Sequence, residues 1–576
     1  MSYDSMLQQA LKLHQQNNLD AAELIYRQIL QTAPNQPNIL NLLGLIAQSR
    51  GLHNEAVSYF EKAIINDFNN FEYYFNLGWS LSAMGKYIEA ETAYNKVIKL
   101  KPDTKEGYNA LGEIYAIRGN NEKAAEMFNL ALAYAPNYPE AMANLAYLKD
   151  DINELIKLKE KFSDNDTIPY YLSLLYREQK QYDEALKYAE VANKICPCEN
   201  YKLLAGELCL HNNQKEQAGK YFKNAVEINP NSVTAIINLA NLEKDSIQAE
   251  KMYKKALDVS PDNFDAHLNY ANMLYQQNRL SEALEEYRKA VIINPASAVV
   301  SNNLGILHRS MGEYDEALGL FLNALNRDYD NKEYSLNIAE TLILLYNKDK
   351  KLAKKIAENW LKSYPDNEFA KHINDSFKGK KSSSCSEYSK HLFDLFADNY
   401  EQVMNNINYN IPDAITEIVS PIKGTIIDLG CGTGLLGEKL KTADNKIIGI
   451  DISDKMLQKA KNKNIYEKLE NADITEYCKN LPNADLVVAG DVLGYIGDVS
   501  DLIKNIYPHP FAFSVAIDKQ SKSDYELTPS GRYVHNEKYI NKILKQCGYK
   551  NIVSNDVILR SEDGKDVNGK IFYAKE

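Results

Sequence analysis

The chain has 576 residues, several times the length of a typical domain, so more than one folding unit is expected. Its 66 Lys and Arg residues against 78 Asp and Glu residues give a net charge of -12, which argues against a protein that mainly grips nucleic acid or an anionic membrane. Seven scattered cysteines without a C-x-x-C pair predict neither a disulfide framework nor a metal site. The N-terminal segment lacks the features of a signal peptide, and a cytoplasmic location is expected.

Residues 1–375 carry an internal repeat of about 34 residues. Prolines fall at Pro34, Pro102 and Pro136, and later ones continue at intervals of 33, 31 and 34 residues: Pro197, Pro230, Pro261 and Pro295. Each follows a pattern of small and aromatic residues. This pattern resembles the tetratricopeptide repeat family, and about eleven units are expected. Because no unit can bury its apolar faces alone, the resemblance implies an α-α superhelix, a solenoid with a long concave face.

The residue types suit pairs of antiparallel helices. In the third unit, Gly78 and Ala90 are small because the two helices are expected to cross there. Tyr94 is expected to fill the gap to the neighbouring repeat, and the proline ends the second helix because it has no N–H to donate. The fifth unit, 139–166, has lost the spacing of its second helix, so we expect a degenerate repeat.

A second pattern places an asparagine ahead of a Leu-Gly, Leu-Ala or similar pair in many first helices: Asn76, Asn144, Asn238, Asn269, Asn303 and Asn337. If these helices face inward, the carboxamides could bond the backbone of an extended peptide. This resembles the asparagine ladder in the tetratricopeptide superhelix of O-GlcNAc transferases, and it implies a protein or peptide partner. The alternative is that the amides simply face water.

The repeat ends before residues 376–386, a Lys- and Ser-rich segment that we interpret as a linker between two separately folding parts. Beyond it, apolar runs rich in Ile and Val alternate with amphipathic stretches, which predicts one doubly wound α/β domain over 387–576 with a mostly parallel sheet. The turn sequence 562–565 predicts that the last two strands pair antiparallel.

The chemistry is expected on the first two strands. The first ends in DLGCGTG, with Gly430, Gly432 and Gly434 before a helix, where glycines allow a sharp turn and close approach of a ligand. The next strand ends in Asp451, about 20 residues on, where a carboxylate can bond both hydroxyls of a ribose. A nucleoside-containing cofactor follows. Asp428 ahead of the loop would repel a pyrophosphate but suits a cofactor with a cationic amino group.

This loop and its spacing resemble the class I S-adenosylmethionine-dependent methyltransferases, which have a Rossmann-like fold. The resemblance implies that the loop from Gly430 to Gly434, Cys431 included, contacts the methionine part of the cofactor and that Asp451 holds its ribose. It also places Ile452 and Met456 beside the adenine and Asp473 at the adenine amine. The other residues that it implies as cofactor contacts are Asp428 and Ile474, together with Gly490 and Asp491, which close the pocket. Segments such as LFDLFADNY and VVAGDVLGYIGDV narrow the resemblance to a bacterial group of predicted methyltransferases that carry tetratricopeptide repeats.

The substrate side is less clearly marked. His535, late in the domain, is the best candidate for a base, against an equally reasonable structural role, and Tyr495 after the fourth strand is the second candidate. Phe393, Phe396 and Tyr400 recur at helical spacing and are interpreted as a helix packed over the cofactor cleft rather than as an aromatic cage.

The function expected from the sequence is a methyl transfer from S-adenosylmethionine to an undetermined acceptor, with the repeats recruiting a protein or peptide. The alternative is a scaffold whose C-terminal domain binds the cofactor without turnover. A repeat-bearing glycosyltransferase is disfavoured, because the last ~190 residues offer one doubly wound unit where that class needs two.

Overall fold

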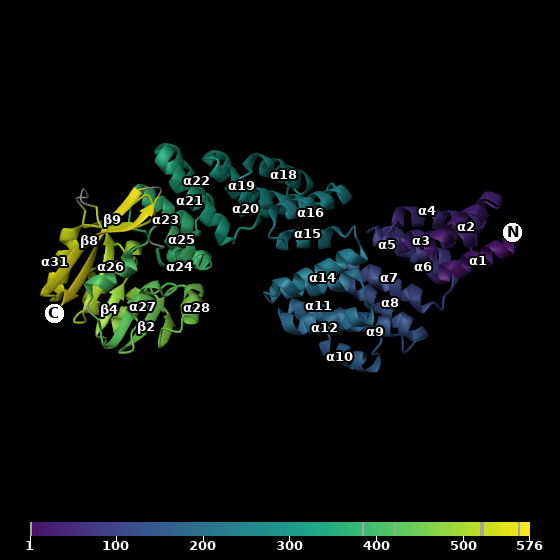
Figure 1. Cartoon of the computed structure of the whole chain (residues 1–576), viewed down its shortest axis with the longest axis horizontal. Helices are drawn as coiled ribbons and strands as arrows, with labels where there is room; N and C mark the ends of the chain where they lie inside the picture. The colour runs from purple at the N-terminus through teal and green to yellow at the C-terminus, as the bar shows by residue number, and fades with distance from the viewer. Residues whose placement is uncertain (1–2, 383–384, 420, 519–522, 563–564) are drawn as a thin grey trace. The chain divides into compact units, whose positions relative to one another are not determined.

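The computed structural model describes residues 3–382, 385–419, 421–518, 523–562 and 565–576 (Figure 1). These residues form two compact units, Met1–Ala266 and His267–Glu576. The division falls inside the repeat array rather than at the predicted linker, and each unit is described by itself.

The first unit consists of helices that pair along the chain, each with its sequence neighbour. Their bounds are Tyr3–Gln15 (α1), Leu19–Thr32 (α2), Pro37–Ser49 (α3), His53–Asn66 (α4), Phe71–Ala83 (α5), Tyr87–Leu100 (α6), Lys105–Ile117 (α7), Asn121–Tyr134 (α8), Pro139–Leu148 (α9), Ile152–Lys161 (α10), Thr167–Glu178 (α11), Tyr182–Ile195 (α12), Glu199–His211 (α13), Lys215–Ile228 (α14), Val233–Leu242 (α15) and Ser246–Val259 (α16).

Glycine and aromatic residues set the packing inside a pair. A Cβ atom on Gly112 would lie 2.6 Å from the Phe128 ring, and one on Gly78 would lie 2.8 Å from Tyr94. Each ring therefore packs on the glycine of its own repeat, and not only toward the neighbouring repeat as the sequence suggested. The turn between the helices needs a left-handed residue, which Gly85 supplies with a φ of 73°.

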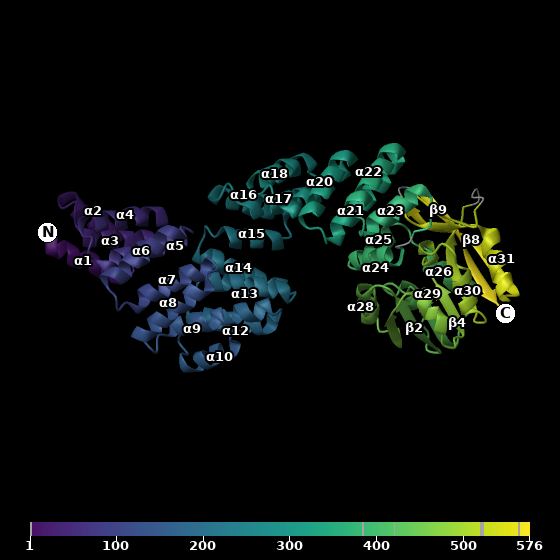
Figure 2. The same ribbon diagram turned by 180° about the vertical axis from the view of Figure 1, so that it is seen from behind.

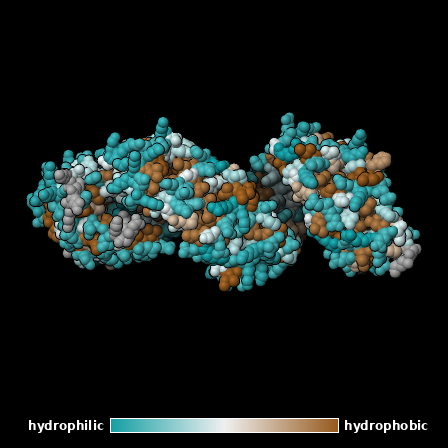
Figure 3. Space-filling view, turned by 90° about the horizontal axis from the view of Figure 1, so that it is seen from above, coloured by the Kyte–Doolittle hydropathy of each residue, from teal (hydrophilic) through white to brown (hydrophobic). Residues whose placement is uncertain are grey.

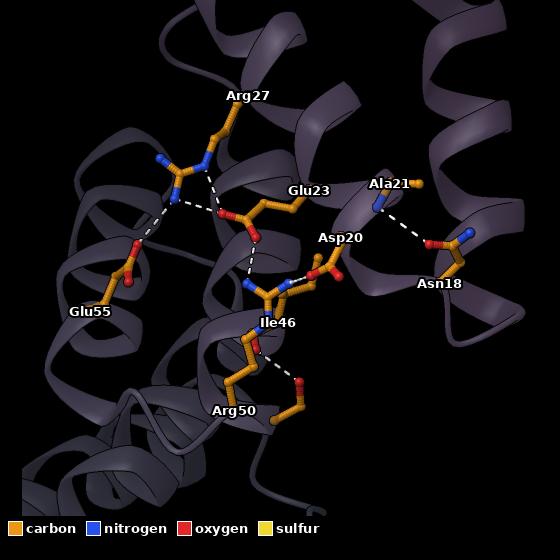
Figure 4. A network of polar contacts seen from close by, with 9 residues as sticks. Asn18, Asp20, Ala21, Glu23, Arg27, Ile46, Arg50 and Glu55 are labelled. Carbon is orange, nitrogen blue, oxygen red and sulfur yellow. Dashed lines mark hydrogen bonds and ion pairs between the residues drawn. The ribbon is translucent and has the colours of Figure 1, made fainter. Parts of the chain in front are cut away.

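The predicted irregular fifth repeat is visible as shorter helices. Both α9 and α10 have 10 residues, whereas most helices of this unit have 13 or 14. Polar contacts add to the packing at the surface of the first two pairs, where Arg27 of α2 contacts Glu23 and Glu55, and Arg50 contacts Asp20 and Glu23 (Figure 4).

The second unit begins with the last repeats, and the unit boundary lies within α17. The helices are Phe264–Gln276 (α17), Leu280–Ile293 (α18), Ala298–Ser310 (α19), Tyr314–Arg327 (α20), Lys332–Lys348 (α21), Lys350–Ser363 (α22) and Glu368–Lys378 (α23), so that α21 and α22 form the eleventh pair.

The predicted linker 376–386 is largely structured. Ser376 lies within α23, Ser382 is buried, and helix α24 begins at Cys385, while residues 383–384 lie outside the described part of the chain. Tyr388 and Leu392 of α24 share one apolar core with Phe369 and Phe377 of α23. This shared core is why the segment does not separate two independent bodies as we expected, and α23 and α24 lie side by side in both ribbon views (Figures 1 and 2). The domain bounds themselves stay predictions.

The remaining chain forms a seven-stranded sheet in the order β3-β2-β1-β4-β5-β9-β8. The strands are Gly424–Leu429 (β1), Asn445–Asp451 (β2), Lys468–Asn471 (β3), Leu486–Ala489 (β4), Phe511–Ala516 (β5), Asn551–Glu562 (β8) and Lys565–Lys575 (β9). The first five are parallel, and β9 pairs antiparallel with β5 and with β8, as predicted. Residues 563 and 564 of the predicted turn lie outside the described residues. A separate hairpin joins Tyr525–Leu527 (β6) to Tyr533–His535 (β7).

Helices cover both faces of the sheet, because alternate residues of each strand point to opposite sides. On one face Ile427, Val487 and Phe513 pack with α30 (Ser500–Ile506) and α31 (Glu537–Cys547). On the other, Ile426 and Val488 pack with α26 (Ile411–Ile418) and α27 (Leu435–Leu440). The other helical segments are Cys385–Phe396 (α24), Tyr400–Asn406 (α25), Asp454–Asn462 (α28), Ile474–Tyr477 (α29), Cys478–Asn480 (η1) and Leu493–Tyr495 (η2).

The predicted fold class, a tetratricopeptide array followed by a doubly wound sheet with an antiparallel last strand, is confirmed. In the space-filling view, apolar side chains form separate patches among hydrophilic ones (Figure 3). None of the helices in the described ranges has the length and apolar composition that a membrane crossing requires.

Candidate active site

A cavity of about 600 Å³ lies in the second unit where strands β1, β2 and β4 end. The strand order reverses between β1 and β4, which is where doubly wound sheets place their ligand crevice. Helices α24 and α25 form another wall of the cavity, and α21 of the eleventh repeat forms a third. A cavity thus lies at the place where the sequence predicted a cofactor cleft, and the repeat array borders it.

The glycine loop after β1 has the backbone conformation that requires glycine. Gly430, Gly432 and Gly434 have φ values of 66°, 54° and 91°. A Cβ on Gly430 would lie 2.2 Å from Val492, whereas the nearest atom to one on Gly432 is 3.9 Å away, on Tyr400. Gly430 and Gly432 line the cavity, and the space above Gly432 allows a ligand to approach the backbone closely.

Asp451 ends β2 as a buried carboxylate at the cavity wall. Its two oxygens accept hydrogen bonds from the backbone N–H of Gly432 at 2.8 Å and of Ser453 at 2.9 Å. Burial raises the pKa of Asp451 to about 6, while these two hydrogen bonds act in the opposite direction. The side chain is thus fixed in place and mostly ionised at pH 7, and each oxygen can accept a further bond.

Asp428, Cys431 and Gly434 were predicted to contact the cofactor, but they do not line the cavity. Asp428 is buried beneath the loop and accepts a hydrogen bond from the Tyr466 hydroxyl at 2.7 Å, and burial raises its pKa to about 7. A Cβ on Gly434 would lie 3.0 Å from Tyr466. Asp428 and Gly434 thus lie against Tyr466, and burial raises the pKa of the Cys431 thiol, as suits a packing role.

The predicted adenine side of the pocket comes together at the cavity, which Ile452, Met456, Asp473 and Ile474 all line. The Asp473 carboxylate accepts hydrogen bonds from Thr475 and from the Ser386 hydroxyl of α24 at 2.8 Å. Burial would raise the pKa of Asp473, but these bonds outweigh it and hold the pKa below its usual value. Asp473 is therefore an ionised acceptor that also ties α24 to the sheet.

After β4, Gly490 and Asp491 line the cavity as predicted. Asp491 has a φ of 58°, an uncommon value for a residue with a side chain. Its carboxylate accepts hydrogen bonds from the buried Arg560 at 2.9 Å and from Arg532 at 3.3 Å. No sequence pattern marked Arg560, which lies on β8, 69 positions away in the chain.

Of the two candidate catalytic residues, Tyr495 lines the cavity and His535 does not. His535 is buried outside the cavity lining, its Nε2 donates to the Gly497 carbonyl at 2.9 Å, and burial lowers its pKa to about 4. The structure thus supports the structural alternative for His535 and not a base. Tyr495 does line the cavity, with the Arg532 guanidinium 5.4 Å from the centre of its ring.

The aromatic residues of α24 and α25 lie where the sequence suggested. Phe393, Phe396 and Tyr400 line the cavity, and the Phe393 ring meets the Tyr495 ring edge-on at 5.2 Å. The sequence reasoning missed the wall from the repeats, which includes Glu340 of α21 and Arg309 of α19. No local pattern marks these two residues, because they resemble other polar positions of the repeats.

Four of the six asparagines of the predicted ladder donate hydrogen bonds to other asparagines of the array. Asn76 donates to Asn41, Asn144 to Asn109, Asn303 to Asn272 and Asn337 to Asn302, at 2.8 to 2.9 Å. Neighbouring first helices are thus joined through their carboxamides. Asn238 and Asn269 are half-buried. Because a carboxamide has two N–H donors and an acceptor oxygen, one such bond does not exclude a peptide ligand, and peptide binding by the ladder stays a prediction.

Comparison with known families supports both parts of the chain. A model described as "Methyltransferase domain" matches residues 427–509, which contain the glycine loop, Asp451 and Asp491. Models described as "Tetratricopeptide repeat" match residues 7–70, 75–140, 200–232, 246–298 and 301–333. The chain combines tetratricopeptide repeats with a methyltransferase domain.

Among relatives of this repeat-bearing methyltransferase-domain protein, the human protein O-mannosyl-transferase TMTC1 is 26% identical over 224 residues, 39% of this chain and 23% of its own. The TPR repeat-containing protein MJ1428 of Methanocaldococcus jannaschii is 26% identical over 218 residues, 38% of this chain and 35% of its own. The chain thus spans about a quarter to a third of the length of these relatives. A solved tetratricopeptide repeat protein from Parabacteroides merdae aligns with 44% of this chain and 98% of its own, at 18% identity and a TM-score of 0.34.

Proposed function

We propose that the protein is a class I methyltransferase that uses S-adenosylmethionine and that its repeats recruit a protein or peptide partner. The observation that carries the proposal is the buried Asp451 carboxylate, held by two backbone N–H groups beside a glycine loop at the switch point of the sheet. The methyltransferase family match covers the same residues.

The residues at the cavity fit this cofactor. The open space above Gly432 lets a ligand lie against the loop, and Asp451 can accept hydrogen bonds from two ribose hydroxyls. Ile452 and Met456 offer apolar contacts for the adenine, and the ionised Asp473 can accept a bond from its amino group. When bound, the cofactor supplies a methyl group on a sulfonium whose leaving group is a neutral thioether.

The protein's part in the reaction is then to align and to exclude water. Phe393, Phe396 and Tyr400 of α24 and α25 line the cavity, and these aromatic side chains reduce the room for water beside the reacting groups. The bond from Ser386 to Asp473 keeps α24 attached to the cofactor side of the pocket.

The recruiting role of the repeats rests on the repeat family rather than on the asparagines. Tetratricopeptide arrays present extended surfaces that bind other proteins. Four of the six predicted ladder residues donate to a neighbouring asparagine, so peptide binding through them would need their remaining donors or acceptors.

Calorimetric titration of the full-length protein with S-adenosylmethionine tests the proposal. Asp451→Asn should weaken binding about tenfold or more, because the amide loses the charge that strengthens the bonds to the ribose. Asp454→Asn is the matched control, since Asp454 is exposed at the first position of α28 and this variant should bind like the wild type. Equal affinity of wild type and Asp451→Asn would exclude this role of Asp451. Transfer of a labelled methyl group to an acceptor separates an enzyme from a scaffold that only binds the cofactor.

A further inference from the structure

The cavity extends beyond the residues proposed to hold the cofactor. Helix α21 of the eleventh repeat turns one face toward it, with Leu336, Ala339 and Ile343 at helical spacing. Val403, Met404 and Ile407, on or just after α25, add apolar surface to the lining. The space left for an acceptor is thus mainly apolar, and part of its wall belongs to the repeat array.

A guanidinium group stands at this part of the cavity. Arg532 lines it from the loop between β6 and β7, with its guanidinium over the Tyr495 ring. This loop is held by helix α23, because His372 of α23 donates from Nε2 to the Gly531 carbonyl at 2.7 Å. His372 is fully buried and burial lowers its pKa to about 4, so the neutral ring keeps this contact at pH 7. Arg532 is therefore a positioned cation and not a mobile surface side chain.

Few of the side chains that line the cavity could remove a proton from an acceptor. Among the described residues that line it, none is a histidine, a lysine or a cysteine. Burial raises the pKa of Tyr388 and of Tyr400, and Asp491 is paired with Arg560 and Arg532. Asp451 and Asp473 face the cofactor side. The remaining candidates are Tyr495 and Glu340. Burial raises the pKa of Glu340, which forms an ion pair with Arg309 at 2.8 Å.

We propose that the acceptor is a carboxylic acid with an apolar body, whose carboxylate is held by Arg532 and becomes a methyl ester. This inference rests on the proposed methyltransferase function. A carboxylate is already ionised at neutral pH, so it needs no base, and a guanidinium matches its planar geometry. The apolar face of α21 receives the rest of the acid.

The transfer balances without a proton step. A carboxylate oxygen gains the methyl group through a new C–O bond. The S–CH₃ bond of the sulfonium donor breaks, and its electron pair stays on the sulfur of the thioether product. An alcohol or ammonium acceptor would instead have to lose a proton to a group in the cavity.

Alkaline lability of the product identifies a methyl ester. The full-length protein is incubated with cell lysate and S-adenosylmethionine labelled in the methyl group, and the products are treated with alkali. We expect most of the label to be released as volatile methanol. Label that stays bound would overturn the ester inference while leaving the methyltransferase proposal intact. Absence of both label and cofactor binding would overturn both.

Arg532 is tested by variants in the same assay. Arg532→Gln should lower the volatile label about tenfold or more, Arg532→Lys should restore part of it, and cofactor affinity should stay unchanged. Arg288→Gln, on an exposed position of α18, is the matched control. If Arg532→Gln instead weakens cofactor binding and leaves the acceptor KM unchanged, Arg532 holds the cofactor and the inference fails.

Binding without the cofactor gives a readout independent of turnover. The full-length protein is titrated with 4-phenylbutyrate and with an apolar hexapeptide that has a free C-terminal carboxylate, each beside its amide. At least one acid should bind about tenfold more tightly than its amide, and Arg532→Gln should remove the difference. The acid that binds tells a small-molecule source from a peptide source. Equal affinity for acid and amide in both pairs would contradict the proposal.

The variant Glu340→Gln tests the alternative in which the acceptor is an alcohol or an amine and Glu340 removes its proton. If the acceptor were an alcohol or an amine with Glu340 as base, kcat should fall about a hundredfold or more, because general-base catalysis contributes that much. For a carboxylate acceptor, we expect kcat to fall less than about tenfold. A hundredfold loss would overturn the proposal.

Discussion

The repeats of the first unit and the sheet domain of the second are built from contacts of very different range. In the repeats, Phe128 packs on Gly112, and Asn144 bonds Asn109 one repeat away. In the second unit, Asp491 of the sheet domain meets Arg560 across 69 positions, and His372 of α23 meets Gly531 across 159. A change in the repeats should therefore be felt locally, whereas a change at the cavity should disturb parts of the chain that are distant in sequence.

The largest expected effect is the loss of stability on replacing Gly430, compared with the same replacement at Gly312, which also has a positive φ. Gly430→Ala adds a Cβ 2.2 Å from Val492 in a backbone conformation with φ of 66°, so it should destabilise the protein by about 3 kcal/mol and abolish cofactor binding. Gly312→Ala, in a repeat turn with φ of 78° and no atom within 4 Å of the new Cβ, should cost about 1 kcal/mol. Chemical denaturation measures both, and equal losses would contradict the distinction.

Inside the repeats, Gly112→Ala should destabilise the protein by about 2 kcal/mol, because its Cβ would meet the Phe128 ring at 2.6 Å. Phe128→Leu in the same chain should recover part of the loss, which a double-mutant cycle measures. Cofactor affinity should stay unchanged in all three variants. A changed affinity would show that the repeat is not energetically local.

The affinity for S-adenosylmethionine should depend on pH through Asp451. Its pKa is raised to about 6, so the carboxylate is ionised above this pH and becomes protonated as the pH falls through it. A neutral acid accepts weaker hydrogen bonds, and we expect affinity to fall about tenfold between pH 7 and pH 5. Calorimetry over this range should show a smaller slope for Asp451→Asn. A variant slope as steep as that of the wild type would assign the dependence to another group.

The smallest effect is expected at the surface network of the first repeats. Arg50→Ala removes the ion pairs to Asp20 and Glu23, but Asp20 is almost fully exposed, so the loss should be below about 1 kcal/mol. Thermal denaturation at low and high salt measures it, and the difference from the wild type should shrink as salt rises. A loss as large as that of Gly112→Ala would show that these ion pairs matter more than packing.

The fold was largely predictable where the pattern is long. The repeat spacing predicted eleven helix pairs, and the apolar runs predicted β1, β2, β4, β5, β8 and β9. Strand β3 and the hairpin strands β6 and β7 were missed, because runs of three or four residues with polar side chains carry no periodic signal. The linker was misjudged for a related reason, since its Lys- and Ser-rich sequence does not reveal that Ser382 donates its N–H to the Tyr533 hydroxyl.

Within the candidate site, most of the predicted cofactor residues line the cavity, whereas Asp428, Cys431, Gly434 and His535 do not. Gly430, Gly432, Asp451 and Asp491 line the cavity, because the carboxyl ends of parallel strands meet at one edge of the sheet. His535 was misplaced, because its distance from the strand ends depends on how the β6–β7 hairpin packs.

The sequence by itself determined the helix pairs of the array, the doubly wound class of the domain and the position of the glycine loop, because these follow from local periodicity and spacing. Only the tertiary structure decided that the asparagines bond one another, that His535 is buried, and that α21 of the last repeat forms a wall of the cavity. The physical reason is that a turn or a periodic face depends on residues that are neighbours in the sequence. Packing between segments far apart in the chain produces no such local sequence pattern.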